Sequence, residues 1–321
     1  MAVIDVFNGD ADGICALSQL RLANPCDSVL VTGVKRDIAL LKNVTAGAGD
    51  CVTVLDVSLD KNREPLAEIL EAGAEVFYVD HHYPGVIPDS DKLTTLINEA
   101  PEICTSLLVN SHLKGAHADW AVVGAFGDNL NKSALTLANS LSLNAADTEQ
   151  LKHLGIYINY NGYGSALEDL HFHPAELFQL LSSHKNPLGF ISENPDAFSR
   201  LEQGYKQDMA AAASVQPEKA DAHSAVFILP DQPWARRVSG VFSNDLANLN
   251  PDRAHSVLTE KANGNFLVSV RAPLTNRTGA ADLCRRFPTG GGREAAAGIN
   301  DLPADQLTDF IDALQSSYGK V

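Results

Sequence analysis

Basic residues are scarce in this chain of 321 residues, which has 24 lysines and arginines against 40 aspartates and glutamates. The formal net charge of −16 argues against electrostatic binding of long nucleic acid or of an anionic membrane surface. A small anionic substrate stays possible, because a bound metal ion can reverse the field inside one cleft. The composition therefore predicts neither long nucleic acid nor membrane among the partners of this protein.

Long apolar runs and cysteine motifs are also missing. The apolar stretch Trp120–Phe126 is far shorter than the about 20 residues that cross a bilayer. The start of the chain is acidic at Asp5 and unlike a signal peptide. The five cysteines are an odd number without a Cys-x-x-Cys pair, which favours reduced thiols and a cytoplasmic location.

Short apolar runs alternate with helical patterns over the first hundred residues. The runs predict strands at Val3–Phe7, Ser28–Val34, Cys51–Leu55 and Glu75–Val79, and the patterns predict helices at Ile14–Ala23, Lys61–Glu71 and Ile103–Leu113. This alternation is typical of an α/β fold whose parallel sheet carries helices on both faces. Such sheets bind their ligands beyond the carboxyl ends of the strands.

A polar segment near Pro217 interrupts the helical middle of the chain and is the predicted linker. We expect a first domain at 1–213 that includes a connecting helix, a linker at 214–222, and a smaller α/β domain at 223–321. The active site is expected in the cleft between the two domains. The oligomeric state stays open between a monomer and a homodimer.

Carboxylates and histidines follow three of the early strands. They are Asp10 and Asp12 after the first strand, Asp56 after the third, and Asp80, His81 and His82 after the fourth. Each taken alone is typical of a helix cap or a turn. Together they fall at one edge of the predicted sheet, where like charges repel unless a cation joins them. Mixed carboxylate and imidazole ligands suit Mn²⁺, Zn²⁺ or Fe²⁺, with Mg²⁺ possible.

These motifs resemble those of the DHH phosphoesterase family, in its RecJ-like branch that acts on short oligonucleotides and pGpG. The matching stretches are Asn8-Gly9-Asp10-Ala11-Asp12-Gly13, Asp56, Asp80-His81-His82 and Asp128. Near the C-terminus, Gly290-Gly291-Gly292-Arg293 resembles the Gly-Gly-Gly-His signature of the DHH-associated C-terminal domain. The resemblance covers nearly the whole chain.

The resemblance implies two divalent metal ions, Mn²⁺ by preference and Mg²⁺ as the alternative, which hold a bridging hydroxide. It implies the following roles: Asp10 on the first metal, Asp12, His81 and Asp128 on the second, Asp56 between both, Asp80 as an orienting residue, and His82 on the substrate phosphate. Asn8 stands where many members carry histidine, and an amide oxygen is a weaker ligand. The first metal site is therefore expected to be looser, and an impaired enzyme is the alternative.

The same resemblance suggests residues that bind substrate. Gly290–Gly292 precede an apparent helix start at Glu294, where backbone N–H groups could hold a phosphate; a tight turn is the alternative. Arg293 could bind phosphate, and so could Arg271, for which a surface ion pair is equally compatible. Asn159 and Tyr163 lie in a stretch that resembles an Asn-x-x-Gly-Arg loop, where tyrosine could stack on a base or simply pack.

Taken together, the sequence predicts a metal-dependent phosphodiesterase that hydrolyses short linear oligonucleotides, especially dinucleotides such as pGpG, to 5′-mononucleotides. The scarcity of basic residues disfavours long single strands as substrates. Two alternatives stay open. One is a phosphohydrolase for a nucleotide phosphate or polyphosphate, and the other is a nucleotide-binding protein with impaired catalysis.

Overall fold

The first of two compact units is built on a parallel sheet. The computed structural model describes residues 1–319, and the chain divides into Met1–Gln203 and Gly204–Val321. The five strands of the first unit run in the order β2-β1-β3-β4-β5, with bounds β1 Val3–Phe7, β2 Val29–Thr32, β3 Cys51–Leu55, β4 Glu75–Asp80 and β5 Leu93–Ile97. Every pairing is parallel, so the predicted sheet is confirmed. The edge strand β5, which is only partly buried, was not predicted.

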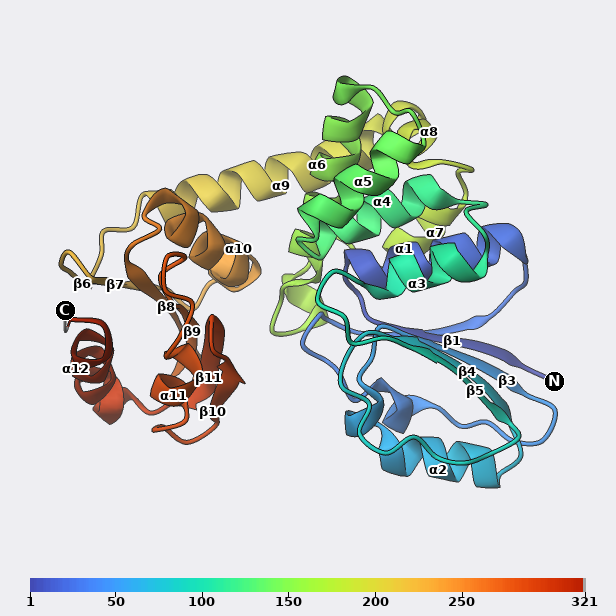
Figure 1. Cartoon of the computed structure of the whole chain (residues 1–321), viewed down its shortest axis with the longest axis horizontal. Helices are drawn as coiled ribbons and strands as arrows, with labels where there is room; N and C mark the ends of the chain where they lie inside the picture. Colours follow the sequence, from blue (N-terminus) through green and yellow to red (C-terminus); the bar gives the residue numbers. More distant parts are fainter. Residues whose placement is uncertain (320–321) are drawn as a thin grey trace. The chain divides into compact units, whose positions relative to one another are not determined.

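Helices cover both faces of this sheet (Figure 1). One face carries α1 (Ala11–Ala23), α3 (Thr105–His112) and α4 (Ala118–Gly127), and the other carries α2 (Arg63–Glu71). The side chains of β3 alternate, so that Val52 and Val54 pack with Leu66 and Ile69 of α2 in one apolar core. Alternation of this kind is what a two-sided sheet requires.

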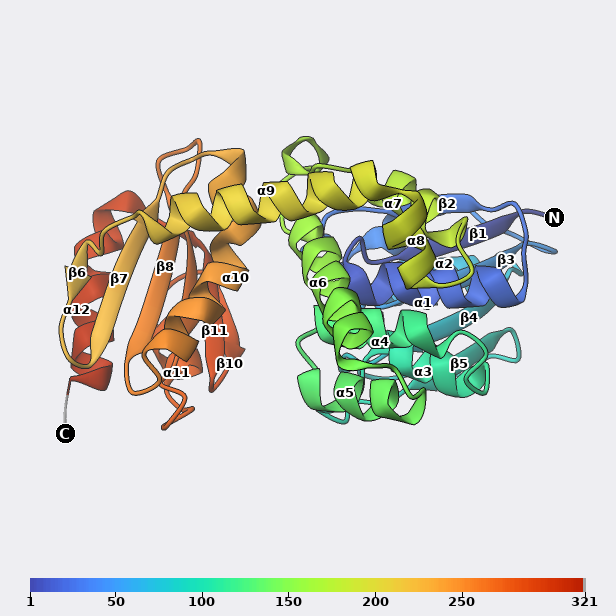
Figure 2. The same ribbon diagram turned by 90° about the horizontal axis from the view of Figure 1, so that it is seen from above.

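Further helices complete the first unit. They are α5 (Asn131–Ser140), α6 (Ala145–Gly162), α7 (Pro174–Ser182), α8 (Pro187–Glu193) and the first part of α9 (Pro195–Ala213). In Figure 2, α6 lies beside α4. The loop expected around Asn159 and Tyr163 is wrong, because α6 continues to Gly162. Its polar end stays helical because the buried Asn161 side chain pairs with both backbone groups of Phe172, at 2.9 and 3.0 Å.

The second unit holds a mixed sheet in the order β10-β11-β9-β8-β7-β6. Its strands are β6 Lys219–Ala220, β7 Ser224–Leu229, β8 Ala254–Glu260, β9 Phe266–Arg271, β10 Gly290–Arg293 and β11 Ala296–Leu302. Only β7 and β8 pair in parallel among the described strands of this sheet. The predicted second α/β unit is confirmed.

Helices pack on both faces of this second sheet (Figure 2). The helix α10 (Pro233–Leu249) packs on the face of Phe227, whose ring lies 5.6 Å from that of Phe242. The helices α11 (Ala280–Cys284) and α12 (Leu307–Tyr318) pack on the face of Val226. Adjacent residues of β7 therefore point into two different cores.

The glycine run forms a strand, so the helix expected to start near Glu294 is wrong. Gly290–Arg293 pairs with Ala296–Leu302 in an antiparallel hairpin. A Cβ at Gly290 would lie 1.8 Å from the carbonyl oxygen of Cys284, and Gly292 has a φ of 135°. Close approach and left-handed backbone thus explain the glycines, and no helix N-terminus is available there for a phosphate.

Candidate metal centre

The predicted carboxylates and histidines of the first unit meet at the carboxyl edge of its sheet. Asp10 and Asp12 follow β1, Asp56 follows β3, and Asp80 ends β4. The strands β1 and β3 are neighbours, although β2 lies between them in sequence. This is the point where strand order reverses, and open parallel sheets bind ligands there.

The start of α1 positions two of the carboxylates. Asp10 caps the helix by accepting a hydrogen bond from the Gly13 amide at 3.1 Å. Asp12 accepts hydrogen bonds from the amides of Thr105 and Ser106, each at 2.7 Å, at the beginning of α3. The partial positive charge of a helix N-terminus stabilises a carboxylate in this place. A side chain at Gly13 would lie 2.3 Å from the carbonyl oxygen of Asn8, so only glycine permits this approach.

Asp56 has a strained backbone. Its φ of 59° lies in the left-handed region, which aspartate and asparagine tolerate better than most residues. Its amide donates to the carbonyl of Val79 at 3.1 Å, and its carboxylate accepts from the Thr105 hydroxyl at 3.3 Å. It caps no helix within residues 1–319. Strain of this kind often accompanies a functional site.

The tautomer of His81 follows from its hydrogen bond. Nδ1 donates to the carbonyl oxygen of Ile103 at 2.9 Å, so Nε2 is the nitrogen that can bind a metal ion once its proton has left. Nε2 lies 3.4 Å from Asp56, 4.0 Å from Asp12 and 3.9 Å from Asp128, the residue that follows α4. A backbone carbonyl that orients a ligand histidine in this way is usual in metal sites.

The neighbouring His82 is oriented by Asp80. Its Nδ1 lies 2.8 Å from one carboxylate oxygen of Asp80, a residue that is fully buried. The other oxygen of Asp80 has no hydrogen-bond partner within the described part of the chain. The ring of His82 is 45% exposed, so Nε2 can meet a molecule from solvent.

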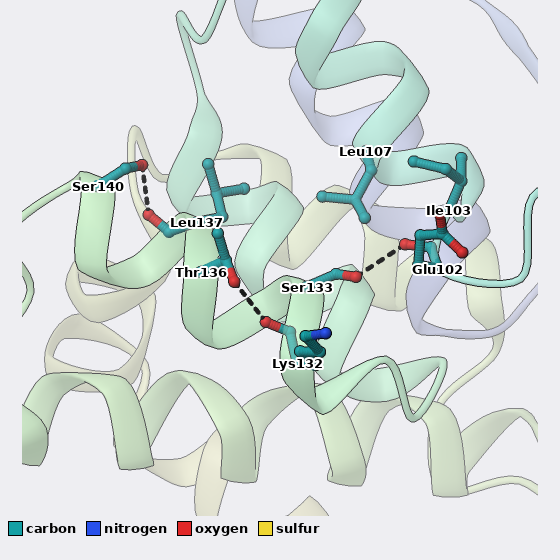
Figure 3. Close-up of a pocket in the computed structure, with 8 residues that line it drawn as sticks. All are labelled: Glu102, Ile103, Leu107, Lys132, Ser133, Thr136, Leu137 and Ser140. Atoms are coloured by element: carbon teal, nitrogen blue, oxygen red, sulfur yellow. Dashed lines mark hydrogen bonds between the residues drawn. The ribbon is translucent and has the colours of Figure 1, made fainter.

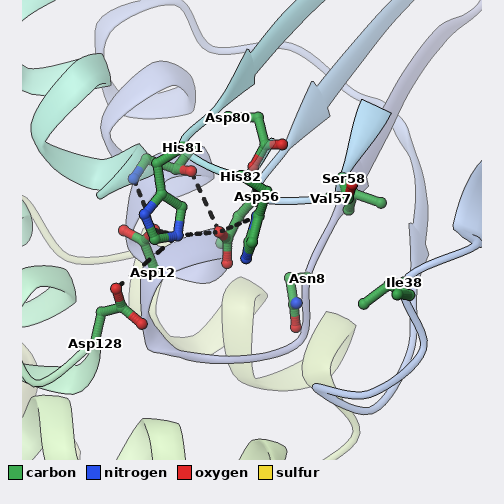
Figure 4. Close-up of polar contacts among 12 residues, drawn as sticks. Asn8, Asp12, Ile38, Asp56, Val57, Ser58, Asp80, His81, His82 and Asp128 are labelled. Atoms are coloured by element: carbon green, nitrogen blue, oxygen red, sulfur yellow. Dashed lines mark hydrogen bonds and ion pairs between the residues drawn. The ribbon is translucent and has the colours of Figure 1, made fainter. Parts of the chain in front are cut away.

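Two overlapping groups of side chains could hold a metal ion. One is Asp12, His81 and Asp128, and the other is Asp56, His81 and His82; within each group the ligand atoms lie within 4.8 Å of one another. Figure 4 shows the side chains of Asp12, Asp56, His81 and Asp128 pointing toward one another. The donor set of carboxylates and imidazole fits the divalent metals expected from the sequence.

The carboxylates and histidines at this sheet edge, here called the carboxylate cluster, are surrounded by excess negative charge when no metal is bound. Protonation of some of these groups then reduces the repulsion among them. Burial, together with the charges of Asp10 and Asp12, raises the pKa of Asp56 well above its usual value. Burial also raises the pKa of Asp128, to about 6. Burial opposes protonation of His81, but Asp56 and Asp12 more than offset it and raise its pKa to about 10. A divalent cation would displace these protons, since its ligands bind in their deprotonated forms.

Lys35 also belongs to the cluster, and no sequence motif pointed to it. Its ammonium group contacts the carboxylate of Asp10 and lies 2.9 Å from Oδ1 of Asn159. The side-chain amide of Asn8 donates to the Lys35 carbonyl at 3.3 Å. In Figure 4, Asn8 lies apart from the network of ion pairs around His81. The general rule that strand ends share one edge could have found Lys35, which follows β2.

The remaining candidate residues fall in two places. Asn159 and Tyr163 lie at the end of α6, where the ring of Tyr163 is 5.4 Å from the Lys35 ammonium. Arg271 and Arg293 belong to the second unit, and both lie opposite Ala296 of β11. Because residues opposite each other in antiparallel strands share a face, the two arginines stand on one face of that sheet.

An apolar pocket of the first unit lies outside the carboxylate cluster (Figure 3). Its volume is about 610 Å³, and its walls include Ile103, Leu107 and Leu137. The hydroxyls of Ser133, Thr136 and Ser140 donate to backbone carbonyls, at 2.7–2.8 Å. None of the residues grouped as metal ligands lines this pocket, so we do not assign it to the reaction.

Known structures share the fold of this chain. The exonuclease RecJ bound to manganese matches with a TM-score of 0.65 at 16% identity, over 100% of this chain and 90% of the other. RecJ from Thermus thermophilus in complex with Mn²⁺ matches with a TM-score of 0.65 at 17% identity, over 98% and 51%. The pGpG-specific phosphodiesterase PggH from Vibrio cholerae matches with a TM-score of 0.57 at 15% identity, over 98% of both chains.

The sequence comparisons add no relative: no family model matches the chain, and no curated protein matches it. Within residues 1–319, no helix is both long and apolar enough to cross a membrane. At 15–17% identity, these structural matches show that the fold is shared and nothing more. Another of them is described as a DHH domain, with a TM-score of 0.63. The chain therefore has the fold of the DHH family.

Proposed function

We propose that this protein is a metal-dependent phosphodiesterase that hydrolyses short linear oligonucleotides, especially dinucleotides such as pGpG, to 5′-mononucleotides. The observation that carries the proposal is the convergence of Asp12, Asp56 and Asp128 on Nε2 of His81. A metal ion bound there supplies Lewis-acid activation of water and of phosphoryl oxygens. We expect Mn²⁺ in this role, with Mg²⁺ as the alternative.

The residues around the ligands have separate roles in this proposal. Asp12 is held in place by two backbone amides, and His81 by one backbone carbonyl, so the ligand geometry exists before metal arrives. In its protonated form, His82 donates from Nε2–H to a phosphate oxygen of the substrate, while Nδ1–H donates to Asp80, whose negative charge stabilises the ring. Asp80 is thus a positioning residue.

Substrate phosphate has candidate partners in both units. In the second unit, Arg271 and Arg293 share one face, and the guanidinium of each can bind a phosphate bidentately. In the first unit, the ring of Tyr163 and the amide of Asn159 lie beside Lys35, where a base could stack. The glycines 290–292 contribute through strand backbone rather than through a helix N-terminus.

Two observations support a short substrate. The net charge of −16 disfavours electrostatic binding of a long strand. One structure with the same fold is a phosphodiesterase specific for pGpG. A nucleotide of two residues needs only a few cationic contacts, and those named above can supply them.

The test is hydrolysis of 5′-phosphorylated RNA of two to seven nucleotides with Mn²⁺ or Mg²⁺, with products separated by chromatography. We expect rapid loss of the dinucleotide and slow loss of longer chains. Glu68→Gln, an exposed carboxylate on α2, is the matched control and should leave the rate unchanged. Equal cleavage of all lengths would instead indicate a general exonuclease. Binding of pGpG without turnover would replace the proposal by a nucleotide-binding role.

A further inference from the structure

The ammonium group of Lys35 occupies one side of the carboxylate cluster. It contacts the Asp10 carboxylate, lies 2.9 Å from Oδ1 of Asn159, and lies 4.0 Å from Asp128. Lys35 thus gives the carboxylates at this edge of the sheet a cation that is independent of any metal. A surface lysine would stay hydrated, whereas the Lys35 side chain is only 21% exposed.

Contacts fix both the backbone and the ammonium group of Lys35. Its backbone amide donates to the carbonyl of Gly162 at 2.8 Å, and its carbonyl accepts from the Asn8 side chain at 3.3 Å. The ring of Tyr163 lies 5.4 Å from the ammonium, within the range of a cation–π contact. The side-chain nitrogen of Asn8 therefore helps to position Lys35, while its buried Oδ1 has no hydrogen-bond partner among the described residues.

The two sides of the cluster differ in what they can bind. Both groups of side chains that could hold a metal within residues 1–319 include His81, and neither includes Asp10. A divalent cation beside Asp10 would face the ammonium of Lys35 at short range, and like charges repel. A cation beside His81 meets three carboxylates instead.

We propose that Lys35 takes the place of a second metal ion, so that the centre binds one divalent cation on the His81 side and keeps a fixed ammonium on the Asp10 side. The role of that ammonium in the reaction rests on the phosphodiesterase function proposed above. There it neutralises a phosphate oxygen of the substrate as negative charge develops, in the way a preorganised cation stabilises a transition state.

The first experiment counts metal without substrate. The purified chain is titrated with Mn²⁺, bound metal is measured after equilibrium dialysis, and the electron paramagnetic resonance spectrum is recorded. We expect one Mn²⁺ per chain with the spectrum of an isolated ion. Two Mn²⁺ per chain with spin coupling would overturn the proposal, because Lys35 must then have moved aside. That result would leave the phosphodiesterase function intact, whereas no bound Mn²⁺ would overturn both.

The second experiment uses Lys35→Ala and Lys35→Arg. We expect Lys35→Ala to keep the Mn²⁺ site beside His81 while kcat for the dinucleotide falls about a hundredfold, the size typical for loss of one charge-stabilising group. Lys35→Arg should recover part of that loss, because it restores the positive charge. The exposed Lys42→Ala is the matched control and should change neither measurement. An unchanged kcat in Lys35→Ala would show that the ammonium has no part in the reaction.

Discussion

The two units differ in how many buried carboxylates they place at one site. The first gathers the carboxylates of Asp10, Asp12 and Asp56 at one edge of its sheet, each almost fully buried. The second buries Asp208 against Arg237, at 2.8 Å, and buries His255 in its neutral form. Paired or neutral groups are the usual content of a protein interior. The first unit follows this rule at Asp5, which pairs with Arg21, but departs from it at the sheet edge, where the excess of buried carboxylates locates its chemistry.

The same difference has a cost in stability. Carboxylates that share one site repel each other, and the raised pKa of Asp56 records this repulsion as well as burial. Function in the first unit therefore opposes stability in the absence of metal, while burial in the second unit serves packing. Substitutions in the two units should separate these effects.

The largest effect is expected for Asp56→Asn. Asparagine keeps the left-handed backbone of φ 59° but removes the negative charge. We expect metal-dependent hydrolysis to fall by about a thousandfold or more, since activation of water depends on the metal ligands. The metal-free protein should melt at a higher temperature at neutral pH. The raised pKa of Asp56 makes the folded chain take up a proton that the unfolded chain releases, and asparagine removes this cost. Retained hydrolysis would remove Asp56 from the metal centre. Asp56→Ala is a poorer test, since alanine also strains the backbone.

The second unit predicts a dependence of stability on pH. Burial, and then the charge of Arg253, lower the pKa of His255 to about 4. Its Nε2 accepts from Arg253 at 3.2 Å, and protonation would remove that acceptor. Between pH 6.5 and about pH 4, His255 is protonated in the unfolded chain but stays neutral in the folded chain. The contribution of His255 to the free energy of unfolding is therefore fully present above pH 6.5 and is lost as the pH falls toward 4.

The size of this effect is about 3 to 4 kcal/mol, because the pKa falls from 6.5 to about 4 and each unit corresponds to about 1.4 kcal/mol. We expect hydrogen exchange of the β8 and β9 amides to accelerate between pH 7 and about pH 4.5, after correction for intrinsic rates. His255→Gln does not titrate and should lose most of this acceleration. An equal acceleration in both proteins would assign the acid sensitivity to other groups.

A smaller effect is expected for Asp80→Asn. Asparagine carries no charge and can present either its oxygen or its NH2 group to Nδ1 of His82, so the proton on Nδ1 and the orientation of Nε2 are no longer fixed. We expect kcat to fall about 10- to 100-fold, as for other groups that orient a functional histidine. Mn²⁺ affinity should change little. Combining Asp80→Asn with His82→Gln should cost no more than His82→Gln alone. Additive losses would mean that Asp80 acts elsewhere.

Much of this architecture was predictable from local patterns. Alternating apolar residues placed β1 and β3 at the observed bounds, and the rule that parallel strands end at one edge brought Asp12, Asp56 and His81 together. The glycines at 290–292 led to the wrong prediction of a helix start, because glycine is common both in hairpins and near helix starts. The distinguishing fact is the backbone of Cys284 packed against Gly290, which only the folded chain reveals.

Lys35 marks a different limit of the sequence. A single lysine in the turn after β2 has the pattern of an ordinary surface residue. The sequence did indicate that the carboxylates need a counter-charge, and metal was the obvious candidate. Only the contacts of Asp10 with Lys35, and of Asn8 with the Lys35 carbonyl, identify a cation carried by the chain itself.

The smallest predicted effect concerns the second unit and sharpens its contrast with the first. Arg271 ends β9, and its guanidinium donates to Asn244 at 2.7 Å and to Ser269 at 2.9 Å, which fixes its direction. If it binds substrate phosphate, Arg271→Ala should raise KM for the dinucleotide about tenfold, equivalent to about 1.4 kcal/mol, and leave kcat nearly unchanged. Arg285→Ala, exposed on the same unit, is the control. A fall in kcat with constant KM would mean that Arg271 acts on the reaction itself. If Arg271 has only a structural role, neither KM nor kcat should change in a variant whose melting temperature is unchanged.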